Sequence, residues 1–141
     1  MTDHLTLQRL VVRLLYDPAL VADLRADPNR VVAPLGLSQT AVGWLVAVDP
    51  RAWGIDTMRR SRTLTALLEE FPATTAFAFQ RPDAATILDT FFSDVAFHGA
   101  IQRRQALAPA FGAWWAGAAT EGLFSPGTAA LATIESGIAR L

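Results

Sequence analysis

The sequence predicts an all-α protein, a compact bundle of about eight to ten short helices. Three observations support this fold class: Asp-Pro pairs recur ahead of apolar runs, leucines repeat at helical spacing, and no two segments alternate as pairing strands do. An aspartate accepts hydrogen bonds from the first amides of a helix, and proline fits the first turn because it has no amide hydrogen. The three helix starts marked in this way are Asp17-Pro18, Asp27-Pro28 and Asp49-Pro50.

The first third of the chain predicts a series of short helices. LTLQRLVVRLLY (5–16) repeats its leucines at i, i+3, i+4 and i+7, which indicates an amphipathic helix that Asp17 ends. Gly36 provides the left-handed conformation that closes the short turn after Asp27-Pro28. Ser38 then caps a further helix in QTAVGWLVAV (39–48).

The remaining chain predicts longer helices. TTAFAF (74–79) fits either a helix or a short strand, and its helical neighbours and the lack of a pairing strand favour the helix. Pro109 divides or kinks the segment 101–119. The other expected helices are 57–71, 85–98 and a last one that Ser125-Pro126 opens. The composition changes near residue 56, so we expect an N-terminal lobe of short helices over 1–56 and a C-terminal helical lobe over 57–141, sharing one core.

Charge and composition exclude several classes of function. Twelve basic and thirteen acidic residues give a net charge of −1, so the chain has no basic excess for nucleic acid. No apolar run has the length of a membrane span, and the N-terminus lacks a signal-peptide pattern, so we expect a cytoplasmic protein. The chain has no cysteine, which removes disulfides, iron–sulfur clusters and a thiol nucleophile.

Few residues could perform catalysis. Of two histidines, only His98 has a carboxylate at helical metal-ligand spacing, Asp94, and such a pair is more often a surface hydrogen bond. No phosphate-binding loop and no nucleophile motif occur. We therefore expect that the chain is not an enzyme by itself and has no cofactor of its own.

Aromatic and basic residues point to recognition instead. Trp114 and Trp115 are adjacent, so on a helix they diverge by about 100° and do not share one core stripe. Either one of them meets solvent or another protein, or both are buried between two layers of helices. Tryptophan is a favoured anchor at protein interfaces. Basic residues at the start of 57–71 oppose the helix dipole, which allows an acidic partner or plain solvation.

Two parts of the chain resemble known families. Residues 20–53, with LGLS and the following WLVAVD, resemble the small non-catalytic subunit of LigAB-type extradiol dioxygenases, which covers the active site of its larger partner. RRSRTLTALLEEFPATTAFAF, FFSDVAFH and AFGAWWA resemble the companion subunits of methanobactin-type multinuclear iron oxidases. In that family a TIM-barrel enzyme oxidises a cysteine of a ribosomally made precursor peptide, and the companion binds the peptide and packs on the barrel.

This second resemblance implies a function in ribosomal peptide natural-product biosynthesis. The chain would be a partner subunit that recruits the precursor peptide to the iron oxidase, and the iron would belong to that enzyme. Its arginines would meet acidic side chains of the peptide, and its tryptophans would lie at an interface. The candidate residues are Trp44, Trp53, Arg59, Arg60, Arg62, Arg103, Arg104, Trp114 and Trp115.

Three alternatives remain open at this point. The chain could be a lid subunit of an extradiol-type dioxygenase, a free-standing helical enzyme that uses His98 and Asp94, or a homo-oligomeric structural protein. Metal analysis and light scattering distinguish them.

Overall fold

The computed structural model describes residues 2–141, and every regular element in them is helical. Eleven α-helices and two 3₁₀ turns occur over this range, so the all-α prediction is confirmed. The ambiguous segment 74–79 lies in a helix, and no strand is found among the described residues. The helices outnumber the expected eight to ten because one-turn segments such as PRAW (50–53) count as helices.

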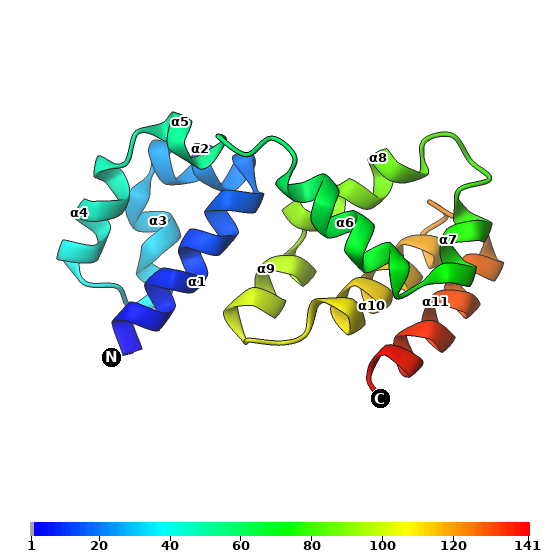
Figure 1. Cartoon of the computed structure of the whole chain (residues 1–141). Helices are drawn as coiled ribbons and strands as arrows, with labels where there is room; N and C mark the ends of the chain where they lie inside the picture. The colour runs from blue at the N-terminus through cyan, green and yellow to red at the C-terminus, as the bar shows by residue number, and fades with distance from the viewer. Residues whose placement is uncertain (1) are drawn as a thin grey trace. The chain divides into compact units, whose positions relative to one another are not determined.

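The chain divides into two compact units, Met1–Thr57 and Met58–Leu141 (Figure 1). The expected lobes differ from them by one residue, and the shared core stays a prediction. The first unit contains α1 (Thr2–Tyr16), α2 (Pro18–Ala26), α3 (Pro28–Val32), the 3₁₀ turn η1 (Ala33–Leu35), α4 (Gln39–Ala47) and α5 (Pro50–Trp53).

Side-chain caps begin four of these helices, as the sequence predicts. The capping oxygens and the amides that donate to them are Asp17 with Ala19 (3.0 Å), Asp27 with Arg30 (3.3 Å), Ser38 with Ala41 (3.2 Å) and Asp49 with Arg51 (2.9 Å). Gly36 has φ +65° and closes η1. The apolar faces of the helices meet in a core of Leu10, Leu14, Leu24, Val32, Val42 and Leu45.

The second unit contains longer helices and an aromatic core. Its elements are α6 (Arg59–Glu69), α7 (Pro72–Ala78), α8 (Ala84–Asp89), the 3₁₀ turn η2 (Thr90–Ser93), α9 (Val95–Gln102), α10 (Leu107–Thr120) and α11 (Pro126–Ala139). The single helix expected over 85–98 is wrong, because the Asp94 carboxylate accepts a hydrogen bond from the Ala96 amide and begins α9 there. Pro109 lies in the first turn of α10, where its missing amide hydrogen costs nothing.

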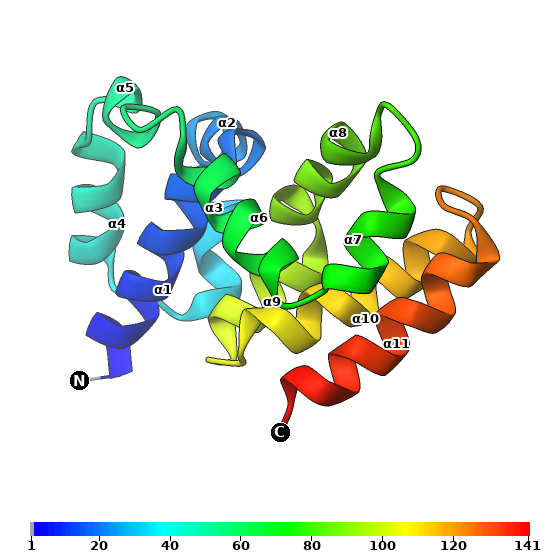
Figure 2. The same cartoon turned by 45° about the vertical axis from the view of Figure 1, so that its right-hand side comes forward.

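Phenylalanine rings fill the centre of this unit. Phe91 makes edge contacts with Phe97 and Phe111 at centroid distances of 5.7 and 5.1 Å, and Phe111 lies 5.2 Å from Trp115. Figure 2 shows α10 and α11 side by side, with α7 beside α11. None of the described helices combines the length and the apolar character that crossing a bilayer requires.

Candidate functional site

The two adjacent tryptophans of α10 point in different directions. Trp115 is fully buried, with 0% of its surface exposed, and packs against Phe71, Phe111 and Phe124. It is a core residue of the second unit, so it offers no surface to a partner. Trp114 is half-buried and lies at the margin of that core. Of the pair, only Trp114 remains a candidate for binding.

Trp114 forms one wall of a pocket of about 640 Å³, here called the Trp114 pocket. Its ring stacks on Phe111 at 25°, with centroids 6.0 Å apart, and lies 5.3 Å from the Phe91 ring. The apolar lining residues are Ala96, Ala106, Pro109, Ala110 and Ala113. The helices α9 and α10 therefore provide an apolar pocket whose aromatic wall is held by the core.

The polar lining of the Trp114 pocket is basic. Arg103 and Arg140 line it together with Gln105, and none of the lining residues is acidic. The Arg103 guanidinium lies over Gly99, where an added Cβ would come within 2.8 Å of its nitrogen. Its contact with the Gln105 side chain is long, at 3.4 Å. Arg140 was missed by the sequence analysis, because a lone arginine near a chain end carries no local signal.

Arg104 has an unusual backbone conformation beside this pocket. Its φ is +56°, the only positive value at a non-glycine residue in the described chain. The amides of Arg104 and Gln105 donate to the carbonyls of Ile101 and Ala100, which is the hydrogen-bond pattern of a Schellman motif at the end of α9. The same pattern ends α10, but there the left-handed residue is Gly122, with φ +89°. Arginine thus occupies a position where glycine is the favourable residue.

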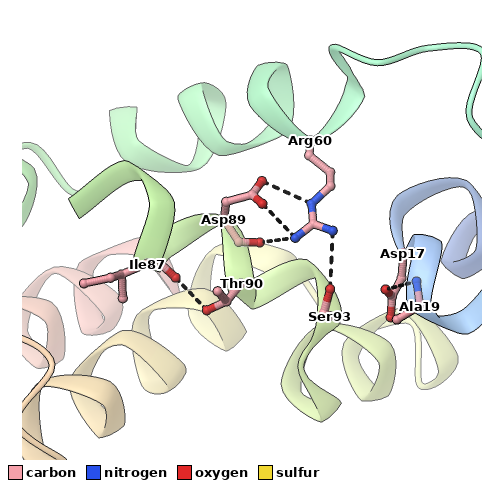
Figure 3. Close-up of polar contacts among 7 residues, drawn as sticks. All are labelled: Asp17, Ala19, Arg60, Ile87, Asp89, Thr90 and Ser93. Carbon is pink, nitrogen blue, oxygen red and sulfur yellow. Dashed lines mark hydrogen bonds and ion pairs between the residues drawn. The ribbon is translucent and has the colours of Figure 1, made fainter. Parts of the chain in front are cut away.

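Arg60 is engaged inside the second unit. Its guanidinium pairs with both carboxylate oxygens of Asp89, at 3.1 and 2.9 Å, and also donates to the Asp89 carbonyl and to the Ser93 hydroxyl (Figure 3). The same group lies 5.4 Å from the centre of the Phe92 ring. Arg60 therefore ties α6 to α8 and η2. Arg59 is half-buried and Arg62 is exposed on the same first turn of α6.

The two tryptophans of the first unit differ in their surroundings. Trp44 is 63% exposed on α4. Trp53 packs against the core of the first unit and lines a smaller pocket, of about 190 Å³, together with Arg25. Neither residue belongs to the Trp114 pocket.

An exposed aliphatic stripe begins on α11 and continues past the end of that helix; its residues, here called the α11 stripe, are Ile134, Ile138 and Leu141. Ile134 and Ile138 are 62% and 61% exposed, and Leu141 is fully exposed. The ring of Phe77 continues the stripe, because it covers Gly127, seven residues before Ile134. The buried face of α11 is formed instead by Thr128, Ala132, Glu135 and Ser136. The buried face of the helix is therefore small and polar, while two of its three large aliphatic side chains, Ile134 and Ile138, are exposed and the third, Leu131, is half-buried. An ordinary surface helix buries its large aliphatic side chains.

The histidine pair considered for chemistry is partly used by the fold. The Asp94 carboxylate caps α9 at 2.8 Å from the Ala96 amide, and His98 lies one turn later with its ring 5.4 Å from that of Phe97. Among the described residues, no three histidine, aspartate or glutamate side chains gather as metal ligands would.

Comparison with protein-family models, with curated proteins and with solved structures gave no match. The geometry of the two surfaces, the Trp114 pocket and the α11 stripe, is therefore the basis for a functional assignment.

Proposed function

We propose that this chain is a non-catalytic accessory subunit that docks on a larger enzyme through the α11 stripe. The observation that carries the proposal is the exposure of Ile134 and Ile138 on α11, on a helix that already packs by its other face. Exposed apolar patches of this kind mark protein–protein contacts, and permanent interfaces are the most apolar ones.

The partner we propose is an iron-dependent TIM-barrel oxidase that modifies a cysteine of a ribosomally made peptide. The support for this choice is the resemblance of the segments around Phe71, Phe92 and Trp114 to companion subunits of such oxidases. The iron belongs to the barrel, and this chain contributes no cofactor. Cytoplasmic location follows from the same proposal, since the peptide substrate is made there.

The second part of the proposed function is recruitment of the precursor peptide. The Trp114 pocket supports it, because an apolar pocket with an aromatic wall and a basic edge suits a peptide anchor. Arg60 is left out of this role, since Asp89 holds its guanidinium.

Co-expression with a tagged barrel oxidase of the methanobactin type tests the docking. We expect a one-to-one complex by size-exclusion chromatography with light scattering. Ile134→Glu combined with Ile138→Glu should abolish the complex, because two charges would be buried at the interface. Val95→Glu is the matched control, since Val95 is 84% exposed on α9 and lies outside the stripe.

Circular dichroism and thermal unfolding of both variants show whether the chain still folds. A wild-type chain that stays monomeric beside the oxidase contradicts the proposal. So does a complex that the stripe variant forms as tightly as the wild type.

A further inference from the structure

We propose that the Trp114 pocket binds an acidic segment of another polypeptide, with one large apolar side chain against Trp114 and flanking carboxylates on Arg103 and Arg140. The inference rests on the proposed function only in taking this segment to be part of the precursor peptide. It assigns the peptide to one pocket of the second unit and names the chemistry that the pocket selects.

The apolar half of the assignment comes from the shape and the lining of the pocket. A volume of about 640 Å³ falls within the range of about 300–1,000 Å³ that is usual for ligand sites. Alanine and proline side chains keep the pocket wide, and the Trp114 ring closes one side. Because Phe91 and Phe111 both contact that ring, it is fixed before a ligand arrives, which lowers the entropy cost of binding.

The charged half comes from the two arginines. Neither Arg103 nor Arg140 forms an ion pair within the part of the chain that the structure describes. Each caps the C-terminal end of its helix, Arg103 that of α9 and Arg140 that of α11, and both line the same pocket. Guanidinium groups pair with carboxylates through two parallel hydrogen bonds. An acidic occupant is therefore complementary to this site.

Gly99 determines where the Arg103 guanidinium lies. Its missing side chain leaves the room in which the Arg103 guanidinium lies, at 2.8–3.1 Å from where a Cβ would be. An alanine there displaces only the far end of a flexible side chain, so the fold loses nothing and the arginine moves. Gly99→Ala thus separates the position of the charge from its presence.

The charges favour a peptide over nucleic acid. The whole chain carries a net charge of −1, so it has no overall basic excess of the kind that binds a phosphate backbone. A short segment with one apolar anchor and two or three carboxylates matches the pocket better than a phosphate backbone does.

Fluorescence anisotropy with labelled dodecapeptides tests the assignment on the isolated chain. The acidic probes are peptides with one central phenylalanine flanked by aspartate and glutamate. In the amide probes, asparagine replaces each aspartate and glutamine replaces each glutamate. We expect the acidic peptides to bind about tenfold more tightly than the amide peptides. Their affinity should fall as the salt concentration rises, because salt screens the charges. Arg103→Gln and Arg140→Gln should each weaken the binding about fivefold. Gly99→Ala should weaken it about threefold without lowering the thermal stability, since alanine is the better helix former.

Arg51→Gln is the matched control, because Arg51 is an exposed arginine of the first unit, and it should leave the affinity unchanged. Equal affinity for the acidic and amide peptides overturns the proposal, as does equal binding to the double variant of Arg103 and Arg140. Competition by a single-stranded oligonucleotide, or self-association that the double variant abolishes, assigns the pocket to another occupant and also overturns it. The peptide-binding assay contains no oxidase, so a negative result in it does not bear on docking through the α11 stripe. A failure to dock on the oxidase likewise does not bear on peptide binding by the isolated chain.

Discussion

The carboxylate of Glu135 on α11 caps the N-terminus of α7 at Thr74. It accepts the amides of Ala73 and Thr74, each at 2.9 Å, and the Thr74 hydroxyl as well. The residue before Pro72 is Phe71, which has no capping oxygen, so α7 has no cap of its own. Glu135 is only 9% exposed, and burial works to raise its pKa. The hydrogen bonds from Thr74 and Ala73 outweigh burial, so the pKa of Glu135 lies below its ordinary value.

Replacing this carboxylate should destabilise the second unit. Glu135→Gln places an amide group against two backbone donors, and we expect a loss of about 2 kcal/mol at pH 7 in urea unfolding. Glu69→Gln, at an exposed glutamate of α6, is the control and should cost less than about 0.5 kcal/mol. A Glu135→Gln variant as stable as the control contradicts the capping role.

The stability supplied by Glu135 should depend on pH. Since its pKa is lower in the folded chain than in the unfolded one, its contribution is complete above the ordinary value of 4.5. It is lost as the pH falls from there through the lowered folded value. The difference in unfolding free energy between wild type and Glu135→Gln should therefore shrink between pH 5 and the acid limit, and a constant difference would show that the carboxylate is not the cause.

Gly112 sets the distance between α10 and α11. An added Cβ would lie 2.7 Å from the Ser136 Cβ and 2.8 Å from the ring of Phe71. Gly112→Ala should therefore cost about 1–2 kcal/mol, although alanine is the better helix former. Gly117→Ala on the same helix meets no atom within 4 Å and should stabilise by about 0.5–1 kcal/mol. Chemical denaturation of the two variants gives opposite signs if the packing is as described, and equal signs contradict it.

Arg104 should be a site where glycine is more stable. Its left-handed backbone costs an L-residue about 1 kcal/mol, so Arg104→Gly should raise the unfolding free energy by a similar amount. Gly122→Ala at the equivalent position after α10 should lower it by as much. Differential scanning calorimetry measures both, and a destabilised Arg104→Gly would show that the arginine side chain contributes more than the strain costs.

Arg60 and Asp89 should be coupled in stability. The pair has two hydrogen bonds, and the Arg60 side chain is 22% exposed, so a double-mutant cycle with Arg60→Ala and Asp89→Asn should give about 1 kcal/mol. Arg60→Ala alone should cost more, since it also removes the contact with Phe92. A coupling energy near zero would show that the ion pair does not stabilise the fold.

The sequence allowed prediction of the helices whose signals are local. Asp17, Asp27 and Asp49 each cap a helix because capping depends on residues two or three positions away. The single helix predicted over 85–98 is wrong although the cap that divides it is also local, because the Asp94 carboxylate accepts the Ala96 amide two positions away. The cap that Glu135 provides for α7 joins residues 61 and 62 positions apart, and no local pattern indicates it.

The candidate site was predictable only in part. Trp114 and Arg103 were both selected from the sequence, but their common pocket depends on how α9 and α10 meet. Arg60 and Trp115 were predicted as binding residues too. In the structure Arg60 pairs with Asp89 and Trp115 packs against Phe71, so both side chains stabilise the fold. Ile134 and Ile138 are spaced as residues on the buried face of a helix usually are. The sequence therefore does not indicate that the opposite face of α11 is the buried one.

The most direct test of the central claim is oxidation of the precursor peptide by the barrel oxidase, followed by mass spectrometry with and without this chain. The account predicts that the chain alone converts no peptide, that the oxidase alone converts little, and that the two together convert it fully. Conversion by the chain alone, or full conversion by the oxidase without it, would contradict the account.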